Sequence, residues 1–322
     1  MKYTSNWISK TIKITLYATF VLLSITTAIW ASGGGRRGIG FFDVMLLPRV
    51  WVGALFCLIG MGLMMKSWVH RNLRSIILGA VFFMFGILPA LPLGRFTWGM
   101  GMHPSPVCAI TKPFLFLSAG REVPVIFITI LAFIAVFSII GNKLFCGWAC
   151  PIGAIQELFN QVPLNKKFKI ILPFKVTNPI RIMIFIIFIT LILAAGIGVY
   201  GYFNPFHFLH WGFELYTIMV MLIVLTASLF IFRPFCYLIC PVGLFTWILE
   251  HFSLVKVKVN SHNCKECNLC IKKSHCPAVS SIIEGKGSHP DCFACGRCIS
   301  ICPEKALRFV KRSTLAKPAE YV

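Results

Sequence analysis

The chain has little charge for its length. Only 13% of its 322 residues are Asp, Glu, Lys or Arg, whereas 57% are hydrophobic. Soluble globular proteins average about 25% charged residues. This deficit excludes an ordinary soluble domain and indicates an integral membrane protein.

Acidic residues are especially scarce. The chain holds 10 Asp and Glu against 31 Lys and Arg, which gives a net charge of +21. Part of the excess lies in the C-terminal tail, and the rest lies in loops beside apolar segments, where cations fix membrane orientation and meet anionic lipid. No base-stacking or recognition motif accompanies it, so we expect lipid and protein partners and no nucleic acid.

Six apolar stretches are long enough to cross a bilayer. They lie near residues 14–30, 44–65, 75–93, 123–142, 178–200 and 214–232. The first has no convincing cleavage site before Gly33, which favours a retained anchor over a signal peptide. The sequence therefore predicts a polytopic α-helical membrane domain with six transmembrane helices over residues 1–252.

Loop charge orients these six segments. With the N-terminus inside, the inner loops carry twelve Lys or Arg and the outer loops carry six. Because positive loops stay on the cytoplasmic side, we expect a multi-pass protein of the cytoplasmic (inner) membrane with both termini in the cytoplasm. The cysteines of the tail would then be reduced thiols.

A small second domain is predicted at residues 253–312, followed by a short tail at 313–322. Val and Lys alternate over residues 254–260, which predicts a strand, and residues 306–311 form a second candidate strand. Two end strands around two cysteine motifs are typical of an α+β two-cluster bacterial ferredoxin. Bound clusters supply folding energy that so small a core lacks.

Eight cysteines of this domain repeat the pattern C-x2-C-x2-C-x(n)-C-P. Three cysteines of each motif bind one 4Fe-4S cluster, and the fourth binds the other cluster. The first cluster is assigned to Cys264, Cys267, Cys270 and Cys302, and the second to Cys276, Cys292, Cys295 and Cys298. Five residues, instead of three, precede Cys276 and lengthen its loop. The alternative is a pair of structural zinc sites, which seldom use this spacing.

Two further motifs repeat inside the membrane domain. Residues 143–154 and 233–244 share C-x3-C-P-[IV]-G at an offset of 90 residues, and Lys143 matches Arg233. In a helix this spacing puts both thiols of a copy on one face. We expect the copies to converge into a catalytic redox or metal site, a further cluster included, formed by Cys146, Cys150, Cys236 and Cys240. The alternatives are two dithiol pairs or buried cysteines that act as small hydrophobic residues.

Two C-x3-C-P motifs at membrane-helix ends, followed by a two-cluster ferredoxin tail, resemble the NapH/NosR/CcoG group of membrane polyferredoxins over residues 120–312. The resemblance implies redox-active C-x3-C-P cysteines. It also implies electron transfer between the quinone pool or a cytoplasmic donor and a partner reductase or a metal-centre assembly pathway. We expect neither the large outer flavin domain of NosR nor the C-terminal immunoglobulin-like domain of CcoG, so the pattern is nearest to NapH.

An uncharged outer loop carries His207, His210 and Glu214. Histidine beside a carboxylate suits a quinone or proton site, because the histidine pKa lies near neutral pH. The same residues could instead bind a metal. Most often, such residues are interfacial polar residues beside an aromatic belt and form no binding site.

These features predict a membrane electron-transfer subunit of an oxidoreductase, similar to a quinol dehydrogenase, with quinone as its substrate. Basic residues near the tail cysteines suit docking of an acidic ferredoxin or flavoprotein, and they suit inner-leaflet lipid equally well. The alternative functions are a maturation factor that reduces copper or thiols for another metalloenzyme, and a redox-sensing regulator.

Overall fold

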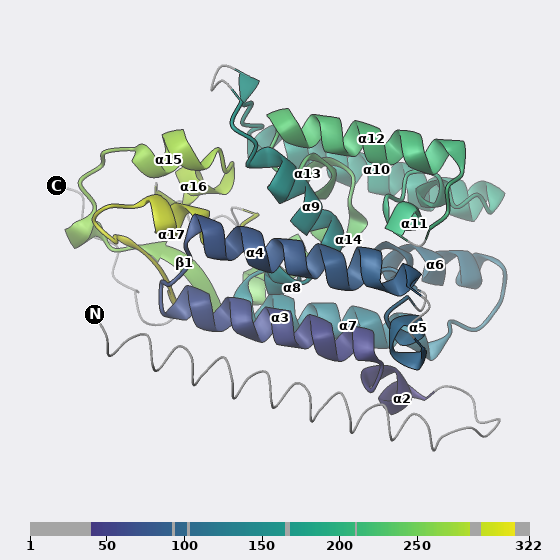
Figure 1. Cartoon of the computed structure of the whole chain (residues 1–322). Coiled ribbons are helices and arrows are strands. Elements are labelled where there is room, and N and C mark those ends of the chain that lie inside the picture. The colour runs from purple at the N-terminus through teal and green to yellow at the C-terminus, as the bar shows by residue number, and fades with distance from the viewer. Residues whose placement is uncertain are drawn as a thin grey trace.

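In a computed structural model of the chain, the described residues are 40–91, 94–101, 104–164, 168–209, 211–283 and 291–312. The first predicted span, residues 14–30, lies outside them. The described part is mostly helical, and its long helices run side by side (Figure 1). A two-stranded sheet lies with the cysteine-rich tail at one end of these helices.

The first helices of the described part include two long ones, α3 and α4, and several short ones. In chain order they are α2 Phe41–Met45, α3 Pro48–Met65, α4 Arg71–Phe82, the π-turn η1 Phe83–Ile87, the 3-10 turn η2 Leu88–Ala90, α5 Arg95–Gly101 and α6 Pro106–Ser118. Both α3 and α6 begin at a proline, whose missing N–H costs nothing at the first helical position. The sequence predicts an outer connection around α6, but this helix packs between the long helices, against α7 Val125–Gly141 and α14 Pro241–Leu249.

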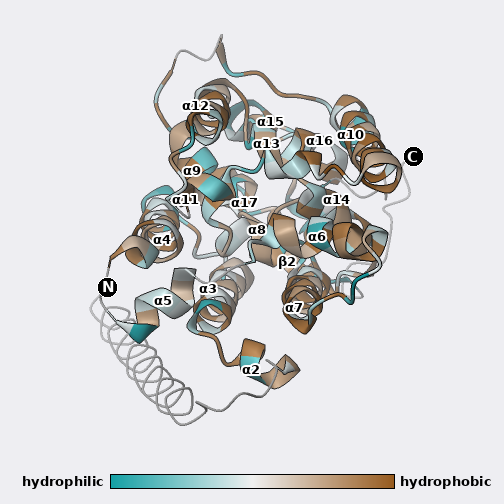
Figure 2. Cartoon of the chain, turned by 90° about the vertical axis from the view of Figure 1, so that its right-hand side faces the viewer, coloured by the Kyte–Doolittle hydropathy of each residue, from teal (hydrophilic) through white to brown (hydrophobic). Residues whose placement is uncertain are grey.

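The two C-x3-C-P repeats have the same local fold. Each consists of a long apolar helix, a one-turn helix and a helix that begins at a proline. The first repeat is α7, α8 Leu144–Trp148 and α9 Pro151–Asn160, and the second is α12 Leu215–Phe230, α13 Pro234–Leu238 and α14. Between them lie α10 Phe174–Ala195, η4 Val199–Gly201 and α11 Phe206–Leu209. The long helices α3, α4, α7, α10 and α12 surround the short helices α8, α13 and α14 (Figure 2).

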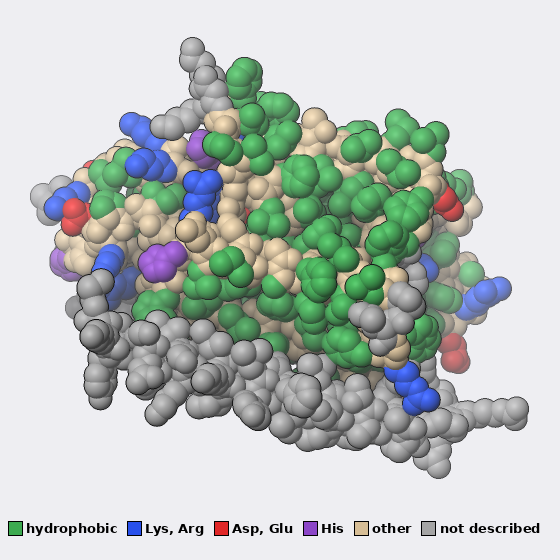
Figure 3. Space-filling model, in the orientation of Figure 1, with side chains coloured by type: hydrophobic (Ala, Val, Ile, Leu, Met, Phe, Trp, Pro, Cys, Tyr) green, Lys and Arg blue, Asp and Glu red, His purple; other side chains and the backbone are tan. Residues whose placement is uncertain are grey.

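Among the described residues, three helical segments are long and apolar enough to cross a membrane. They are Pro48–Met65, Arg71–Ala90 and Phe174–Ala195, which correspond to the predicted spans 44–65, 75–93 and 178–200. Helices α7 and α12, at the predicted spans 123–142 and 214–232, are apolar but have 17 and 16 residues. On the face seen in Figure 3, hydrophobic side chains cover the helical part, and charged side chains gather toward its two ends. Such an apolar exterior suits contact with lipid.

The tail is a small ferredoxin-like unit. Its elements are η5 Glu250–Phe252, β1 Val255–Val259, η6 Ser261–Asn263, α15 Leu269–Ser274, α16 Ala278–Ile283, α17 Arg297–Ile301 and β2 Leu307–Lys311. The strands pair antiparallel with Val257 opposite Phe309, and both side chains are buried. The two predicted strands are therefore confirmed. They bring the two ends of the tail together, so that both cysteine motifs lie between them in sequence and near each other in space.

Candidate functional site

Four cysteines of the two repeats line one cavity, which we call the membrane thiol site. They are Cys146, Cys150, Cys236 and Cys240. The rest of the lining is apolar and includes Pro106, Phe206 and Phe293. Pro106 and Phe206 belong to connections between predicted spans, so these connections reach inward to the cysteines.

Each repeat bends at the same two points. The residue before the one-turn helix, Lys143 or Arg233, has a left-handed backbone with φ of 61° and 50°. The second cysteine, Cys150 or Cys240, is the N-cap of the next helix, with ψ of 118° in both copies. The expectation that C-x3-C follows one continuous helix is therefore wrong. The following proline disfavours the helical conformation of the cysteine before it.

The glycine that ends each motif allows the backbone to pass closely. A Cβ atom on Gly153 would lie 2.9 Å from the carbonyl oxygen of Cys146. A Cβ atom on Gly243 would lie 2.6 Å from the carbonyl oxygen of Cys236. Since real Cβ atoms do not approach backbone oxygen so closely, the C-P-[IV]-G pattern is explained by packing around the first cysteine of each copy.

Buried cations cross from one repeat to the other. Arg233 of the second copy donates to the carbonyl oxygen of Cys146 at 2.7 Å, and Lys143 of the first copy donates to a carbonyl oxygen of the second at 3.2 Å. Arg181 on α10 donates to the carbonyl oxygen of Cys236 at 3.3 Å. All three cations are fully buried. The Nε atoms of both arginines lack a hydrogen-bond partner within the described part of the chain, so the site has donor capacity for a further group.

A polar side chain of each copy also lies near the first cysteine of the other copy. Gln156 Nε2 lies 3.5 Å from the Sγ of Cys236. Thr246, which is 90 residues later in the sequence, has its Oγ1 atom 3.9 Å from the Sγ of Cys146. Each repeat thus completes the surroundings of the other, and the two copies form one site.

Buried carboxylates balance only part of the positive charge. Burial favours the neutral form of a carboxyl group, but the guanidinium groups of Arg74 and Arg233, each 2.5 Å away, lower the pKa of Glu157 to about 2. Burial raises the pKa of Glu250. Within the described part of the chain, four cations are buried against three carboxylates: Arg74, Lys143, Arg181 and Arg233 against Glu157, Glu250 and Asp291. An anionic group in the cavity would offset the excess.

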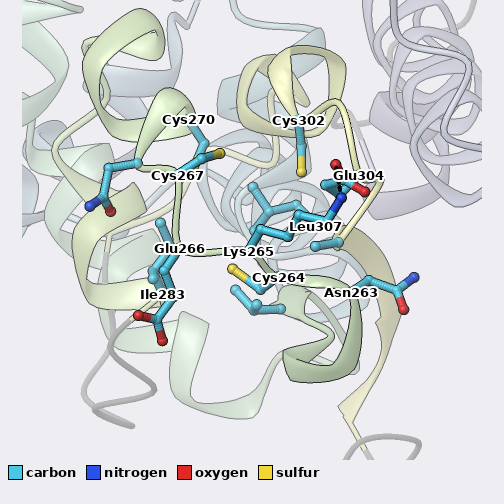
Figure 4. A pocket seen from close by; sticks show the side chains of 13 residues that line it. Asn263, Cys264, Lys265, Glu266, Cys267, Cys270, Ile283, Cys302, Glu304 and Leu307 are labelled. Atoms are coloured by element: carbon cyan, nitrogen blue, oxygen red, sulfur yellow. Dashed lines mark hydrogen bonds and ion pairs between the residues drawn. The ribbon is translucent and has the colours of Figure 1, made fainter.

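The first tail site opens to the surface. Its pocket is lined by Cys264, Cys267, Cys270 and Cys302, which lie around a hollow beside β2 (Figure 4). Cys267 is exposed and the other three are half-buried. Lys265 and Glu304 form an exposed ion pair of 2.9 Å at the pocket. The set assigned from the sequence to the first cluster therefore shares one pocket.

The second tail site is buried. Its cysteines are Cys276, Cys292, Cys295 and Cys298, and they lie close enough to interact electrostatically with one another. Burial, together with the nearby Cys295, raises the pKa of the Cys276 thiol to about 12. Without a metal this thiol is protonated at neutral pH, and metal binding has to displace the proton.

The donor sets consist of cysteines, the ligands that 4Fe-4S clusters use. Within the described part of the chain, no three His, Cys, Asp or Glu side chains are close enough to hold one ion. A structural zinc site gathers four thiolates around one ion at about 2.3 Å. A 4Fe-4S cube binds its four cysteines at separate corners and keeps them farther apart.

The second tail motif is fastened to the helical bundle through its backbone. Asn142 Nδ2 donates to the carbonyl oxygen of Cys292 at 3.3 Å, and Trp148 Nε1 donates to that of Ala294 at 2.8 Å. Asn142 directly precedes the first C-x3-C-P copy, and Trp148 lies within it. The loop around Cys292 is thereby held directly against the membrane thiol site.

Asp291 forms buried ion pairs that also hold this loop on the helical bundle. Its carboxylate pairs with Lys143 and, at 3.1 Å, with Arg181, while its carbonyl oxygen accepts a 3.2 Å hydrogen bond from the Tyr237 hydroxyl. The sequence pattern does not identify Asp291 and Glu157 as parts of the site. The one available signal was the match of Lys143 with Arg233, two cations that require buried partners.

His207 and Glu214 are not among the residues that line the membrane thiol site. His207 is in α11 and Glu214 is the N-cap of α12. Burial lowers the pKa of His207, and Lys112 adds to this effect. His210 lies outside the described residues.

Comparisons with known proteins identify related sequences. A family model described as a 4Fe-4S binding domain, Fer4_5, matches residues 123–171 and 213–260. The chain is 30% identical over 202 residues to an uncharacterized protein of Methanocaldococcus jannaschii, a match that covers 60% of this chain and 74% of that protein. It is 28% identical over 211 residues to the ferredoxin-type protein NapH of Haemophilus influenzae, with 60% and 72% covered. It is 27% identical over 192 residues to the regulatory protein NosR of Stutzerimonas stutzeri, with 54% and 25% covered. No solved structure matches the chain.

Proposed function

Because this chain belongs to the NapH/NosR-type family of ferredoxin-type membrane proteins, we propose that it passes electrons between the quinone pool or a cytoplasmic donor and a partner reductase. Electron transfer through 4Fe-4S clusters is what the family match supports directly. When bound, such clusters accept and release one electron at a time. The identity of the donor and the acceptor is the proposed part.

The tail is proposed to hold two clusters in the assigned pairing. The first would be held by Cys264, Cys267, Cys270 and Cys302, and the second by Cys276, Cys292, Cys295 and Cys298. The shared pocket of the first set and the mutual proximity of the second set support this pairing. The exposed first site would face a soluble partner, and the buried second site would face the membrane domain.

A third cluster is proposed at the membrane thiol site. The observation that carries this proposal is that Cys146, Cys150, Cys236 and Cys240 line one cavity. The 4Fe-4S family model matches each repeat separately, yet each repeat has only two cysteines of the motif, so one cluster needs both copies. Buried cations with unpaired Nε donors suit the net negative charge of a four-thiolate cluster. Two neutral dithiol pairs would leave the excess of buried cations over buried carboxylates unbalanced.

The chain's own residues would protect and orient these groups. The cations that cross between the repeats hold the two C-x3-C-P loops in register. The apolar lining excludes water from the membrane thiol site. Exposed Lys272 and Lys273 on α15 suit an acidic donor such as a ferredoxin or flavoprotein. We place the protein in the cytoplasmic membrane with both termini inside, which a reporter fused to the C-terminus would test.

The proposal is tested with full-length protein in lipid nanodiscs. After chemical reduction, a water-soluble quinone analogue should oxidise the tail clusters of the parent rapidly. In the double variant Cys146→Ser/Cys236→Ser, oxidation by the quinone should slow at least tenfold, while a soluble protein oxidant still oxidises the tail at the parent rate. Cys57→Ala, which changes a buried cysteine outside the motifs, is the matched control. Parent-like quinone oxidation in the double variant would contradict the proposal.

A further inference from the structure

Phe293 lies where the buried tail site meets the membrane thiol site. It stands in the tail motif between Cys292 and Cys295, and its side chain also lines the cavity formed by the four repeat cysteines. Only 2% of the residue is exposed. One residue therefore belongs to the motif of the buried tail site and lines the cavity of the membrane thiol site.

The position of the Phe293 ring is fixed from several directions. The Lys143 ammonium lies 5.2 Å and the Arg233 guanidinium 5.0 Å from the ring centroid, within cation–π range. Tyr237 meets the ring edge to face, with centroids 4.9 Å apart. The two cations are the matching residues of the two repeats, so the ring is held by both copies in the same way.

The backbone of Phe293 is equally constrained. A Cβ atom on Gly147 would lie 2.1 Å from the Phe293 carbonyl oxygen, so only glycine permits this approach. The neighbouring Ala294 carbonyl accepts the Trp148 hydrogen bond. Since the loop cannot move back without breaking these contacts, they hold Phe293 at the membrane thiol site.

We propose that Phe293 is a positioning residue that seals the membrane thiol site on its tail side and couples it to the site of Cys276, Cys292, Cys295 and Cys298. This inference rests on the proposed function. Electronic coupling across a short gap depends on continuous packed atoms, and the Phe293 side chain provides them here. An electron lost on one side of the ring is gained on the other, so the transfer needs no further reactant.

The experiment compares Phe293→Ala and Phe293→Leu in the full-length protein. Phe309→Leu is the matched control, because Phe309 is a buried phenylalanine of the same tail that does not line the cavity. The first measurement is alkylation of the full-length protein, purified anaerobically with its metal content intact, by a small thiol reagent, read by mass spectrometry at Cys146 and Cys236. We expect Phe293→Ala to raise their labelling at least fivefold, with Phe293→Leu and Phe309→Leu near the parent.

The second measurement is electron paramagnetic resonance of the reduced, iron-loaded protein. We expect the magnetic interaction between the two sites to weaken in Phe293→Leu at unchanged iron content, and to stay at the parent level in Phe309→Leu. Parent-like labelling in Phe293→Ala together with an unchanged interaction in Phe293→Leu would overturn the inference. If the parent lacks the third cluster, the proposed function fails at the membrane thiol site, while the labelling still decides whether Phe293 is the seal.

Discussion

Asp291→Asn removes the one carboxylate that joins the tail to two buried cations. Asp291, Lys143 and Arg181 are all fully buried, and Asp291 pairs with both cations. The asparagine keeps the size of the side chain, so the substitution deletes charge with little change in packing. It leaves two cations next to the loop around Cys292 without their counterion.

The structure sets the size of the expected effect. Removing one partner of a buried ion pair costs about 3–5 kcal/mol, because the remaining charge stays desolvated. At about 1.4 kcal/mol for each factor of ten, the loop around Cys292 should open about 100-fold to 4,000-fold more often. The exposed pair of Lys265 and Glu304 provides the contrast, since exposed pairs contribute at most about 1 kcal/mol.

Hydrogen exchange measures this opening directly. In full-length protein, amides of residues 291–295 should lose about two to three and a half orders of magnitude of protection in Asp291→Asn. Glu304→Gln should change their protection less than tenfold, and Asp291→Asn combined with Lys143→Met should recover part of the loss. Protection in Asp291→Asn within threefold of the parent would refute the reasoning that this buried ion pair holds the tail on the bundle.

Two further predictions concern the repeats. Gly153→Ala and Gly243→Ala should each lower the iron content by about four per chain, because the added Cβ displaces the first cysteine of a copy. Gly62→Ala, whose added Cβ meets no atom within 4 Å, should leave the iron content unchanged. Parent-like iron content in both motif variants would contradict the packing argument. Glu157, with its pKa lowered to about 2, contributes stability that is present above its ordinary pKa of about 4.5 and lost as the pH falls toward 2. The unfolding temperature of metal-free protein should therefore fall between pH 4.5 and 2.5, and it should fall less in Glu157→Gln. An equal fall in both proteins would show that the Glu157 ion pairs do not cause the pH dependence.

Local patterns in the sequence were sufficient to predict which cysteines lie together. The spacing of Cys264, Cys267 and Cys270 predicts that they share one cluster, and the alternation of Val and Lys predicts β1 from side-chain geometry alone. The 90-residue repeat predicts that two copies occupy equivalent places. These signals are short in sequence, so a single chain contains them in full.

The contacts that turn these parts into one site are long-range. Asp291 meets Lys143, and Phe293 meets both Lys143 and Arg233, across separations that no local pattern reports. The sequence also does not predict that α6 packs among the other helices, because a short apolar segment between two longer ones resembles a connecting loop. The break at Cys150 was the avoidable error, because the following proline already disfavours a continuous helix.

The most direct test of the central claim is the iron and acid-labile sulfide content of anaerobically purified full-length protein. Three clusters require about twelve iron and twelve sulfide per chain, and Cys146→Ser/Cys236→Ser should retain about eight of each. A parent with about eight iron, unchanged in the double variant, would contradict the claim that the two membrane repeats together hold a cluster.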